Sequence, residues 1–191
     1  LYEDSNILAI DKPSGILVHP DQRSKKKTIL DLFSKKYPKI EIAHRLDKET
    51  SGVMVLAKNK KAYEFLKNQF KNREIKKTYL AIVSGWLKDD KGIINKMIGR
   101  SPTDFRRYSA TRGARGEMRE AITQYKVLKR FQAPAKFTYL EVYPKTGRTH
   151  QIRVHLKSIN HPVACDSLYN PNSVFPKEIK RLALHAKSIE F

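Results

Sequence analysis

One carboxylate in this sequence stands inside a strongly basic segment. Asp47 ends the run His44-Arg45-Leu46-Asp47 and is followed by Thr50-Ser-Gly52, a turn that leads into apolar residues ending at Ala57. Two interpretations of Asp47 are open on this segment alone. Its side chain could bond nearby backbone N–H groups as a turn residue, or it could act as a catalytic nucleophile or base.

A second segment collects cationic and hydrogen-bonding side chains, Lys145-Thr-Gly-Arg148-Thr-His150-Gln-Ile-Arg153-Val-His155. Its glycine turn opens a predicted helix, and helix N-termini attract anions through free backbone N–H groups and the dipole. At ~100° per residue, Arg153 falls at the border of the apolar stripe of that helix, so we expect it to be partly buried. A buried Arg is costly unless a carboxylate faces it, and Asp47 is a candidate partner. The alternative is an Arg that extends to water.

The whole chain is strongly basic. Its 191 residues include 39 Lys and Arg against 19 Asp and Glu, which gives a formal charge of +20 and a pI near 10.0. The excess lies in two internal segments, Lys58–Lys77 and Lys96–Arg119, rather than in a tail or on one amphipathic helix as in basic membrane-surface proteins. We therefore expect a nucleic acid as partner and no membrane.

Aromatic residues occur in both basic segments. In the first, Tyr63, Phe65 and Phe70 are expected with Leu66 to form the buried stripe of a helix. In the second, glycines and a proline predict a loop, so its arginines are expected to contact RNA.

The types and spacing of the residues argue against a metal site, a bound cofactor and a disulfide. His150 and His155 are five residues apart, which is not the spacing of a zinc-binding helix, and Cys165 is the only cysteine. No run approaches the ~18 apolar residues of a membrane span, and the first residues lack signal-peptide features. We expect a cytoplasmic protein without cofactor or metal. Because Leu rather than Met comes first, we also expect that an N-terminal RNA-binding domain is missing from this chain.

The length predicts one domain over residues 1–191, and the patterns predict its elements. Strands are expected in pairs, so the predicted class is α+β, with a largely antiparallel or mixed sheet and flanking helices. The expected strands are 6–11, 16–19, 53–57, 78–83, 122–131, 137–143 and 182–191. The expected helices are one that begins at Thr28 and ends before Pro38, 60–72 and 149–159.

Six motifs of the chain, in order, resemble those of RNA pseudouridine synthases of the RluA branch. They are Ile10 to Pro20, His44 to Gly52, Lys77 to Gly85, Thr146 to His155, His161 to Asn170 and Arg181 to Ala186. Cys165 and Asn170 stand where the family often has Gly. Asn tolerates positive φ and Cys does not, so we expect a local difference at Cys165.

The resemblance implies a reaction and roles for these residues. Uracil is detached from its ribose, rotated and rejoined through carbon, without cofactor or net redox change. Asp47 would be the essential carboxylate, acting at the sugar C1′ or on its C2′ proton. Tyr79 would stack on the uracil, and Arg153 would pair with Asp47 and keep it ionised.

The resemblance also implies contacts with RNA, either rRNA or tRNA, for a monomeric enzyme. Arg45 would occupy the space that the flipped base leaves, and Leu184 would form an apolar wall of the pocket. His44, Thr50, Arg148 and His150 are the other expected substrate or RNA contacts. Without the resemblance, Tyr79 would be interpreted as strand core.

Two rival functions remain open at this point. A non-catalytic, ribosome-associated RNA-binding protein would explain the charge and the aromatic residues, but it has no need for Asp47 beside phosphates. A metal-dependent nuclease would need clustered carboxylates, which the sequence does not offer.

Overall fold

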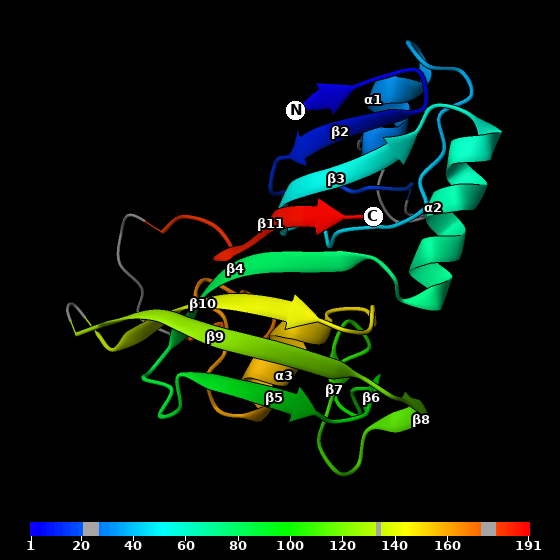
Figure 1. The fold of residues 1–191 in the computed structure, drawn as a ribbon. Coiled ribbons are helices and arrows are strands. Elements are labelled where there is room, and N and C mark those ends of the chain that lie inside the picture. Colours follow the sequence, from blue (N-terminus) through cyan, green and yellow to red (C-terminus); the bar gives the residue numbers. More distant parts are fainter. Residues whose placement is uncertain (21–26, 133–134, 173–178) are drawn as a thin grey trace. The chain divides into compact units, whose positions relative to one another are not determined.

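The computed structural model describes residues 1–20, 27–132, 135–172 and 179–191. These residues form two compact units, the first made of Leu1–Lys77 and His185–Phe191 and the second of Thr78–Leu184. The chain passes from one unit to the other within β4 (Lys76–Ser84) and within β11 (Leu184–Glu190), both labelled in Figure 1. The prediction of a single domain stays a prediction.

The first unit is built on strands in the order β1, β2, β3, β11. β1 (Tyr2–Glu3) and β2 (Ile7–Lys12) are antiparallel, as are β2 and β3 (Ser51–Ala57), whereas β3 and β11 are parallel. The predicted strands at 6–11, 53–57 and 182–191 are therefore confirmed with small shifts of their ends. Because side chains alternate along a strand, this sheet presents a different apolar set on each face.

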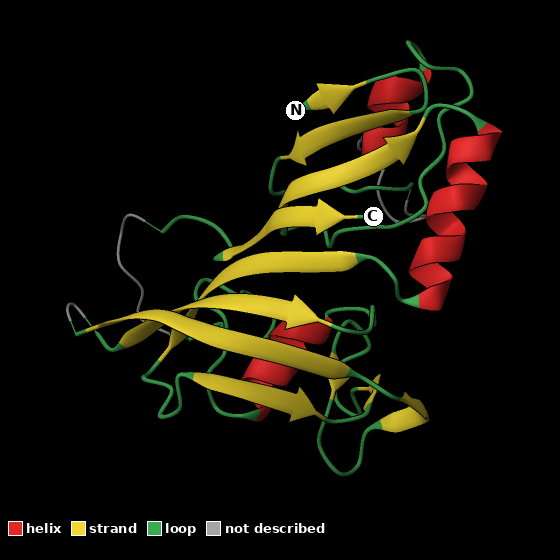
Figure 2. Cartoon of the chain, in the orientation of Figure 1, coloured by secondary structure: helices red, strands yellow, loops and turns green. Residues whose placement is uncertain are grey.

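A helix packs against each set. The paired residues Leu8 and Leu56 form a core cluster with residues of α1 (Ile29–Ser34), while Val55 and Ala57 form another with α2 (Lys60–Asn72). Figure 2 shows α1 and α2 in red beside the strands of this unit. The sequence thus places apolar residues on both faces of β3, which explains why this strand is buried almost throughout.

Local signals set the ends of these helices. Thr28 caps α1 in a reciprocal arrangement, in which its Oγ1 accepts from Asp31 N at 3.2 Å and the Asp31 carboxylate accepts from Thr28 N at 2.9 Å. Asn59 Oδ1 accepts from Ala62 N at the start of α2, and Arg73 ends that helix in a left-handed conformation. The predicted start of α1 and the predicted bounds of α2 are confirmed.

The predicted buried stripe of α2 is wrong at Phe65. Leu66 is buried and Tyr63 and Phe70 are partly buried, but Phe65 is 57% exposed. Successive helix residues point about 100° apart, so with Leu66 facing the sheet its neighbour Phe65 turns to solvent.

The predicted strand at residues 16–19 is wrong. Two of its backbone carbonyls are bound by groups other than the backbone N–H of a neighbouring strand: Leu17 O accepts from Ile29 N at 2.9 Å, and Ile16 O accepts from the Lys12 side chain Nζ at 2.8 Å. The segment is apolar because it covers α1 and the end of β2, and not because it extends the sheet.

Antiparallel strands in the order β4, β10, β9, β5 form the main layer of the second unit. The predicted pair, β9 (Ile122–Phe131) and β10 (Phe137–Pro144), is confirmed, although residues 133–134 of the expected turn lie outside the described residues. β5 (Lys91–Asn95) was not predicted. It is short, contains a glycine and buries only Ile94 of its two isoleucines, so its apolar signal is weak.

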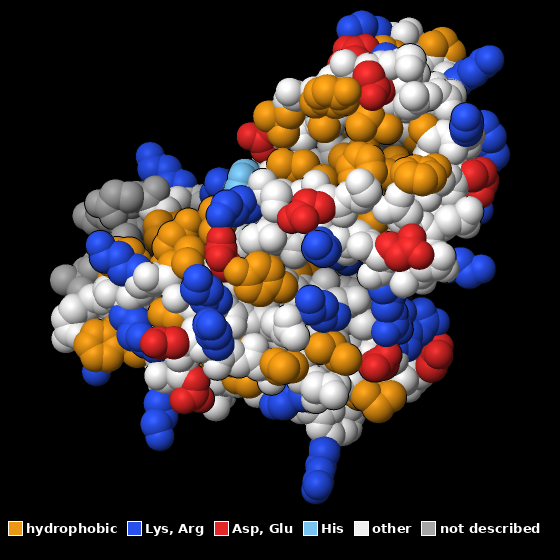
Figure 3. All heavy atoms as spheres, in the orientation of Figure 1, with side chains coloured by type: hydrophobic (Ala, Val, Ile, Leu, Met, Phe, Trp, Pro, Cys, Tyr) orange, Lys and Arg blue, Asp and Glu red, His pale blue; other side chains and the backbone are white. Residues whose placement is uncertain are grey.

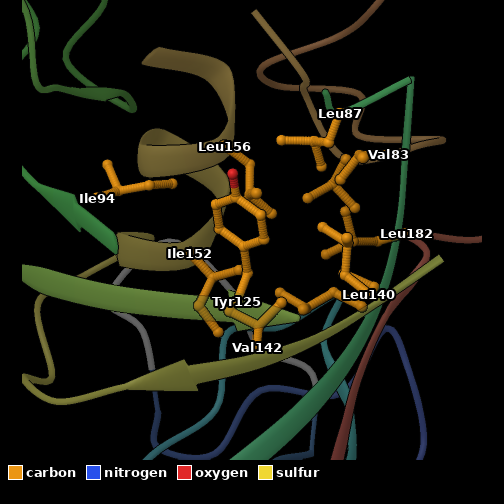
Figure 4. Close-up of a cluster of buried hydrophobic side chains, with 12 residues drawn as sticks. Val83, Leu87, Ile94, Tyr125, Leu140, Val142, Ile152, Leu156 and Leu182 are labelled. Carbon is orange, nitrogen blue, oxygen red and sulfur yellow. The ribbon is translucent and has the colours of Figure 1, made fainter. Parts of the chain in front are cut away.

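The core of the second unit lies between this layer and α3 (Gln151–Ser158). Ile152 and Leu156 of the helix pack with Leu140 and Val142 of β10 and with Tyr125 of β9 (Figure 4). This arrangement confirms a helix in the predicted region 149–159, and it fixes the helix that carries Arg153.

The prediction of a plain loop for the Arg-rich segment is wrong. It forms a small sheet in the order β7 (Tyr108–Ser109), β6 (Ile98–Arg100) and β8 (Arg115–Arg119). Ile98 is buried with Ala121, Val154 and Tyr169, which anchors the segment to the rest of the unit. Taken together, the elements confirm the predicted α+β class.

Candidate functional site

Asp47 lies in a tight turn in front of β3. Thr50 N donates to Asp47 O at 3.1 Å, and Leu46 and Thr50 are buried on either side of it. Asp47 itself is partly buried, whereas Arg45 is exposed. The two buried neighbours hold the turn in place, so Asp47 is positioned by the fold instead of moving with a surface loop.

A second segment of the first unit binds the carbonyl groups of this turn. Gly15 N donates to Lys48 O at 2.8 Å, and Ser14 Oγ donates to Glu49 O at 2.7 Å. Lys12 Nζ also donates to Lys48 O, at 3.0 Å. The motif that runs from Ile10 to Pro20 therefore holds the backbone next to Asp47.

Lys12 is a residue whose role the sequence analysis missed. It is fully buried, and its Nζ donates to three carbonyls, those of Pro13, Ile16 and Lys48. Burial lowers the pKa of this ammonium to about 8, partly opposed by the nearby charges of Glu49 and Asp47. A lysine at the end of an apolar strand run, just before Pro-x-Gly, was the signal that could have identified it.

The start of β3 leaves no room for a side chain at Gly52. This glycine has φ of 113°, and a Cβ atom there would overlap the backbone of Ala186, its partner on β11. The neighbouring pair is joined by side chains, since Ser51 Oγ lies 2.9 Å from His185 Nδ1. The Thr-Ser-Gly run is therefore required by strand pairing as well as by the turn.

His44 serves the fold of the first unit. Its Nε2 accepts from Val55 N at 3.0 Å, and its ring stacks on Phe70 with the centroids 4.7 Å apart. Burial, and secondly the charge of Lys77, lower the pKa of His44 to about 4. His44 is thus neutral at physiological pH, and its contact with RNA stays a prediction.

In the second unit, Arg153 is held by a carboxylate that the sequence analysis did not propose as its partner. Arg153 Nε donates to Asp166 Oδ2 at 2.7 Å and Nη2 donates to Asp166 Oδ1 at 2.8 Å, with both side chains buried. Asp166 also accepts from the backbone N–H groups of Leu168 and Tyr169. Arg153 is buried more completely than the predicted partial burial, and the signal for Asp166 was its place in the fifth motif.

Aromatic residues complete the surroundings of Arg153. Its guanidinium lies 5.0 Å from the ring centroid of Tyr169, whose hydroxyl is 2.9 Å from His150 Nδ1 and accepts from Tyr108 N at 2.9 Å. His150 has φ of 55° and directly precedes α3. His150 is therefore tied to Arg153 through Tyr169, and its contact with RNA stays a prediction.

Gln151 joins α3 to β9. Its Oε1 accepts from Arg148 N at 2.9 Å, and its Nε2 donates to Ile122 O at 3.0 Å. Arg148 Nε donates to Glu120 O at 3.0 Å, which sets the direction of that side chain. His155 is fully buried, and its Nε2 lies 2.9 Å from Lys96 O.

Tyr79 and Leu184 both belong to the hydrophobic core of the second unit. Tyr79 is partly buried on β4, opposite Val142 of β10, and Leu184 is buried at the start of β11. The interpretation of Tyr79 as a core residue of a strand therefore agrees with the structure. Its stacking on uracil stays a prediction.

The turn that contains Cys165 keeps the backbone conformation that glycine favours. Cys165 has φ of 55°, and its Sγ donates to Ile179 O at 3.0 Å. Asn170 is the other residue that stands where the family often has Gly. Its side-chain Nδ2 donates to Ser84 Oγ at 3.1 Å. The cysteine is accommodated at a position where L side chains are rare, and Asp166 follows it directly.

The predicted site residues thus fall into two sets. The first unit carries His44, Arg45, Asp47 and Thr50, and the second carries Tyr79, Arg148, His150, Arg153 and Leu184. A pair between Arg153 and Asp47 would join residues of different units and stays a prediction. Among the described residues, no three His, Cys, Asp or Glu side chains come together as a metal site would need, and no helix is both long and apolar enough to span a membrane.

Comparison with known proteins places these residues in a family. The family described as RNA pseudouridylate synthase matches residues 6–158. An uncharacterised RNA pseudouridine synthase of Aquifex aeolicus is 41% identical over 192 residues, which cover 95% of this chain and 59% of that protein. The ribosomal large subunit pseudouridine synthase D of Nitrosomonas europaea is 39% identical over 202 residues, covering 100% and 56%. The chain spans less than two thirds of the length of these relatives.

Solved structures that superimpose on this chain come from proteins whose descriptions also name an RNA pseudouridylate synthase domain. The human RNA pseudouridylate synthase domain containing 1 superimposes with a TM-score of 0.83 at 28% sequence identity, covering 98% of this chain and 76% of that one. The human protein described as RNA pseudouridylate synthase domain containing 4 superimposes with a TM-score of 0.80 at 27% sequence identity. The match covers 99% of this chain and 82% of that one. The similarity therefore extends over nearly all of the chain described here.

Proposed function

This chain belongs to the RNA pseudouridylate synthase family, and from that membership we propose that it converts uridine in RNA to pseudouridine. The reaction breaks the bond between uracil N1 and ribose C1′, turns the base, and forms a bond between uracil C5 and C1′. The hydrogen on C5 leaves as a proton and N1 takes up a proton, so the product is an isomer of the substrate. Uracil leaves as a resonance-stabilised anion that stays bound, so the chemistry needs one essential carboxylate.

The observation that carries the proposal is the position of Asp47. It lies partly buried in the turn before β3, and Lys12, Ser14 and Gly15 bind the carbonyls of the two residues that follow it. A fixed carboxylate can either attack C1′ or abstract the C2′ proton, and a mobile one would do neither efficiently. Tyr79 is assigned to stacking on the uracil and Leu184 to the apolar wall of the pocket.

The positive charges of the chain support an RNA substrate. Net charge is +20 over the sequence, and Lys and Arg side chains are widespread on the face shown in Figure 3. The small sheet β6–β8 adds a local concentration, with the Arg100 guanidinium 4.7 Å from the Tyr108 ring centroid and Phe105 66% exposed. Arg45, exposed next to the Asp47 turn, is assigned to the space of the flipped base.

Large-subunit ribosomal RNA is the proposed substrate, because several relatives are described as ribosomal large subunit pseudouridine synthases. Transfer RNA is the alternative. We also propose that the reaction takes place in the cytoplasm, and that the enzyme acts as a monomer without metal or cofactor.

The test compares wild type with Asp47→Asn, which is nearly isosteric but supplies no carboxylate. Transcribed large-subunit rRNA and tRNA are incubated with each protein, and pseudouridines are mapped by carbodiimide modification. Release of tritium from 5-tritiated uridine in the RNA is followed in single-turnover assays. We expect Asp47→Asn to abolish both signals while RNA affinity is unchanged or slightly higher, because a negative charge near phosphates has been removed.

The matched control is Asp89→Asn, which removes an exposed carboxylate and should retain activity. Wild-type protein that binds RNA but forms no pseudouridine in either RNA would support the non-catalytic alternative. Tritium release that survives in Asp47→Asn would exclude Asp47 as the catalytic carboxylate.

A further inference from the structure

A pair of exposed aromatic residues lies outside the candidate site, at the end of the second unit where β9 finishes. Trp86 is 41% exposed and Phe131 is 37% exposed. The indole Nε1 of Trp86 donates to Phe131 O at 2.8 Å. The two rings therefore come from segments that are 45 residues apart in sequence and bonded in space. Single exposed aromatic residues are common, but a bonded pair is a structured feature.

The segment that carries Trp86 is tied firmly to β9 and β10. Arg130 Nε donates to Leu87 O at 2.9 Å, and its Nη1 pairs with Asp90 Oδ1 at 2.8 Å. On the other strand, Thr138 Oγ1 donates to Gly85 O at 2.7 Å and accepts from Leu87 N at 3.2 Å. In Figure 1 the chain after β4 runs beside the end of β9. The aromatic rings are thus held in place before any partner binds.

Each ring has a lysine ammonium close to its face. Lys136 Nζ lies 4.8 Å from the Trp86 ring centroid, and Lys129 Nζ lies 5.2 Å from that of Phe131. Asp90, in the segment that carries Trp86, is paired with Arg130. The patch therefore combines two partly exposed aromatic rings with two lysine ammonium groups, and among the described residues no acid is paired with either lysine.

We propose that Trp86, Phe131, Lys129 and Lys136 form an accessory binding site for unpaired nucleotides of RNA, separate from the residues assigned to isomerisation. Aromatic faces stack on bases of any sequence, and flexible lysines follow the phosphates of a single strand. The site would hold a single-stranded part of a structured substrate. The inference rests on the proposed function only in taking RNA as the ligand.

A protein partner fits this patch less well. Protein interfaces have few lysines at their centres, because a compact, strongly hydrated ammonium is costly to bury. Here the two lysines lie over the rings themselves, where a nucleotide can use both the ring and the charge. RNA is therefore the occupant that the chemistry of the patch favours.

Trp86 is the only tryptophan of the chain, so its fluorescence reports on this site alone. The protein is titrated with a single-stranded oligoadenylate of roughly ten nucleotides, a length that an aromatic groove of this kind can occupy. Oligoadenylate contains no uridine and cannot be isomerised, so the signal does not depend on catalysis. We expect saturable quenching. A fully paired RNA duplex and heparin, which offer no free base, should leave the fluorescence almost unchanged.

Variants separate stacking from charge. With labelled oligoadenylate and fluorescence anisotropy, Trp86→Ala should weaken binding by about ten-fold, while Trp86→Phe should retain most of the affinity because a ring remains. Lys129→Gln with Lys136→Gln should lower the slope of log K against log salt by about 1.4, or ~0.7 for each phosphate contact. The matched control, Lys35→Gln with Lys39→Gln, removes two exposed lysines of the first unit and should change the slope much less.

Wild-type fluorescence that stays unchanged at saturating oligoadenylate would overturn the proposal, whether or not the protein makes pseudouridine. Equal quenching by heparin, equal loss of affinity in both Trp86 variants, or equal slopes in both lysine pairs would also overturn it. A wild type that is quenched as expected but forms no pseudouridine would support the accessory site and reject the proposed reaction, so the two failures are distinguishable.

Discussion

Arg153 and Asp166 form a buried ion pair joined at two points, with Nε to Oδ2 at 2.7 Å and Nη2 to Oδ1 at 2.8 Å. The two parallel bonds fix the plane of the guanidinium as well as its position. Asp166 is itself fixed, because the backbone N–H groups of Leu168 and Tyr169 both donate to its Oδ1 at 3.0 Å. The direction in which Arg153 presents its remaining nitrogen is thus set by the turn that follows Cys165.

Asp166→Asn tests this relationship. The amide keeps the shape of the side chain but leaves the buried Arg153 charge without Asp166, and breaking a buried pair typically costs ~3–5 kcal/mol. We expect a loss of unfolding free energy in that range, measured by urea denaturation followed by circular dichroism. At temperatures where the variant is folded, single-turnover isomerisation should also be slower by at least ten-fold.

Asp89→Asn serves as the comparison, because that carboxylate is exposed and should change stability by less than about 0.5 kcal/mol. If Asp166→Asn were as stable as this control and as active as wild type, the pair would have no role in positioning Arg153.

Arg153→Met addresses the same pair from the other side. Met fills much of the volume without the charge, so it leaves the Asp166 carboxylate buried and unpaired. We expect turnover to fall by two orders of magnitude or more while RNA affinity changes less than three-fold, because the Arg153 side chain is buried and bound to a carboxylate. Filter binding and single-turnover rates at saturating enzyme measure the two effects separately. A variant with weak binding and a normal rate would assign Arg153 to the RNA surface.

The sequence predicted what depends on local patterns. The helix at Lys60–Asn72, the cap at Thr28 and the β9–β10 pair each follow from residues close together in the chain, and each is confirmed. The strand predicted at 16–19 failed because its partner groups are the side chain of Lys12 and the start of α1, which no periodicity reveals. The Arg-rich segment was predicted as a loop from its glycines and proline, and its strands of two to five residues are too short for a periodic pattern to indicate a sheet.

The same division applies to the candidate site. Burial of Arg153 followed from helix geometry, but its pairing with Asp166 needs a turn 13 residues further along the chain. Lys12 directly follows the strand predicted at 6–11, and only the folded structure shows that its ammonium binds the carbonyl of Lys48, next to Asp47. Charge and motif therefore indicated which residues matter, whereas the groups that position them required the structure.

His44 predicts a dependence of stability on pH. The unfolded chain binds a proton at this imidazole near pH 6.5, whereas the folded chain does so only near 4, because burial and the charge of Lys77 oppose protonation. Unfolding therefore takes up a proton between these values, so the stability that His44 contributes is present above pH 6.5 and is lost as the pH falls towards 4. The loss should amount to roughly 3 kcal/mol at most.

His44→Gln checks the assignment, because glutamine can accept from Val55 N but does not titrate. Unfolding free energies of both proteins are measured by urea denaturation between pH 4 and 7.5. The difference between wild type and variant should shrink steadily below pH 6.5 and stay constant above pH 7. A difference that is independent of pH throughout this range would contradict the lowered pKa of His44.

The last prediction concerns Gly52, which couples the Asp47 turn to the pairing of β3 with β11. Gly52→Ala adds a Cβ atom at φ of 113° and into the backbone of Ala186, so β3 must shift where it begins. Gly113→Ala is the matched control, since Gly113 also has positive φ, 91°, but its Cβ atom would meet nothing within 4 Å. The control should cost about 1 kcal/mol from the backbone conformation alone, and Gly52→Ala should cost about 3 kcal/mol or more. Urea denaturation measures the difference.

Because the shift occurs in the strand that follows the turn, Gly52→Ala should also lower the single-turnover rate in the folded fraction, whereas Gly113→Ala should not. Equal costs for the two variants would mean that β11 can move away from β3, and that strand pairing does not constrain the position of Asp47.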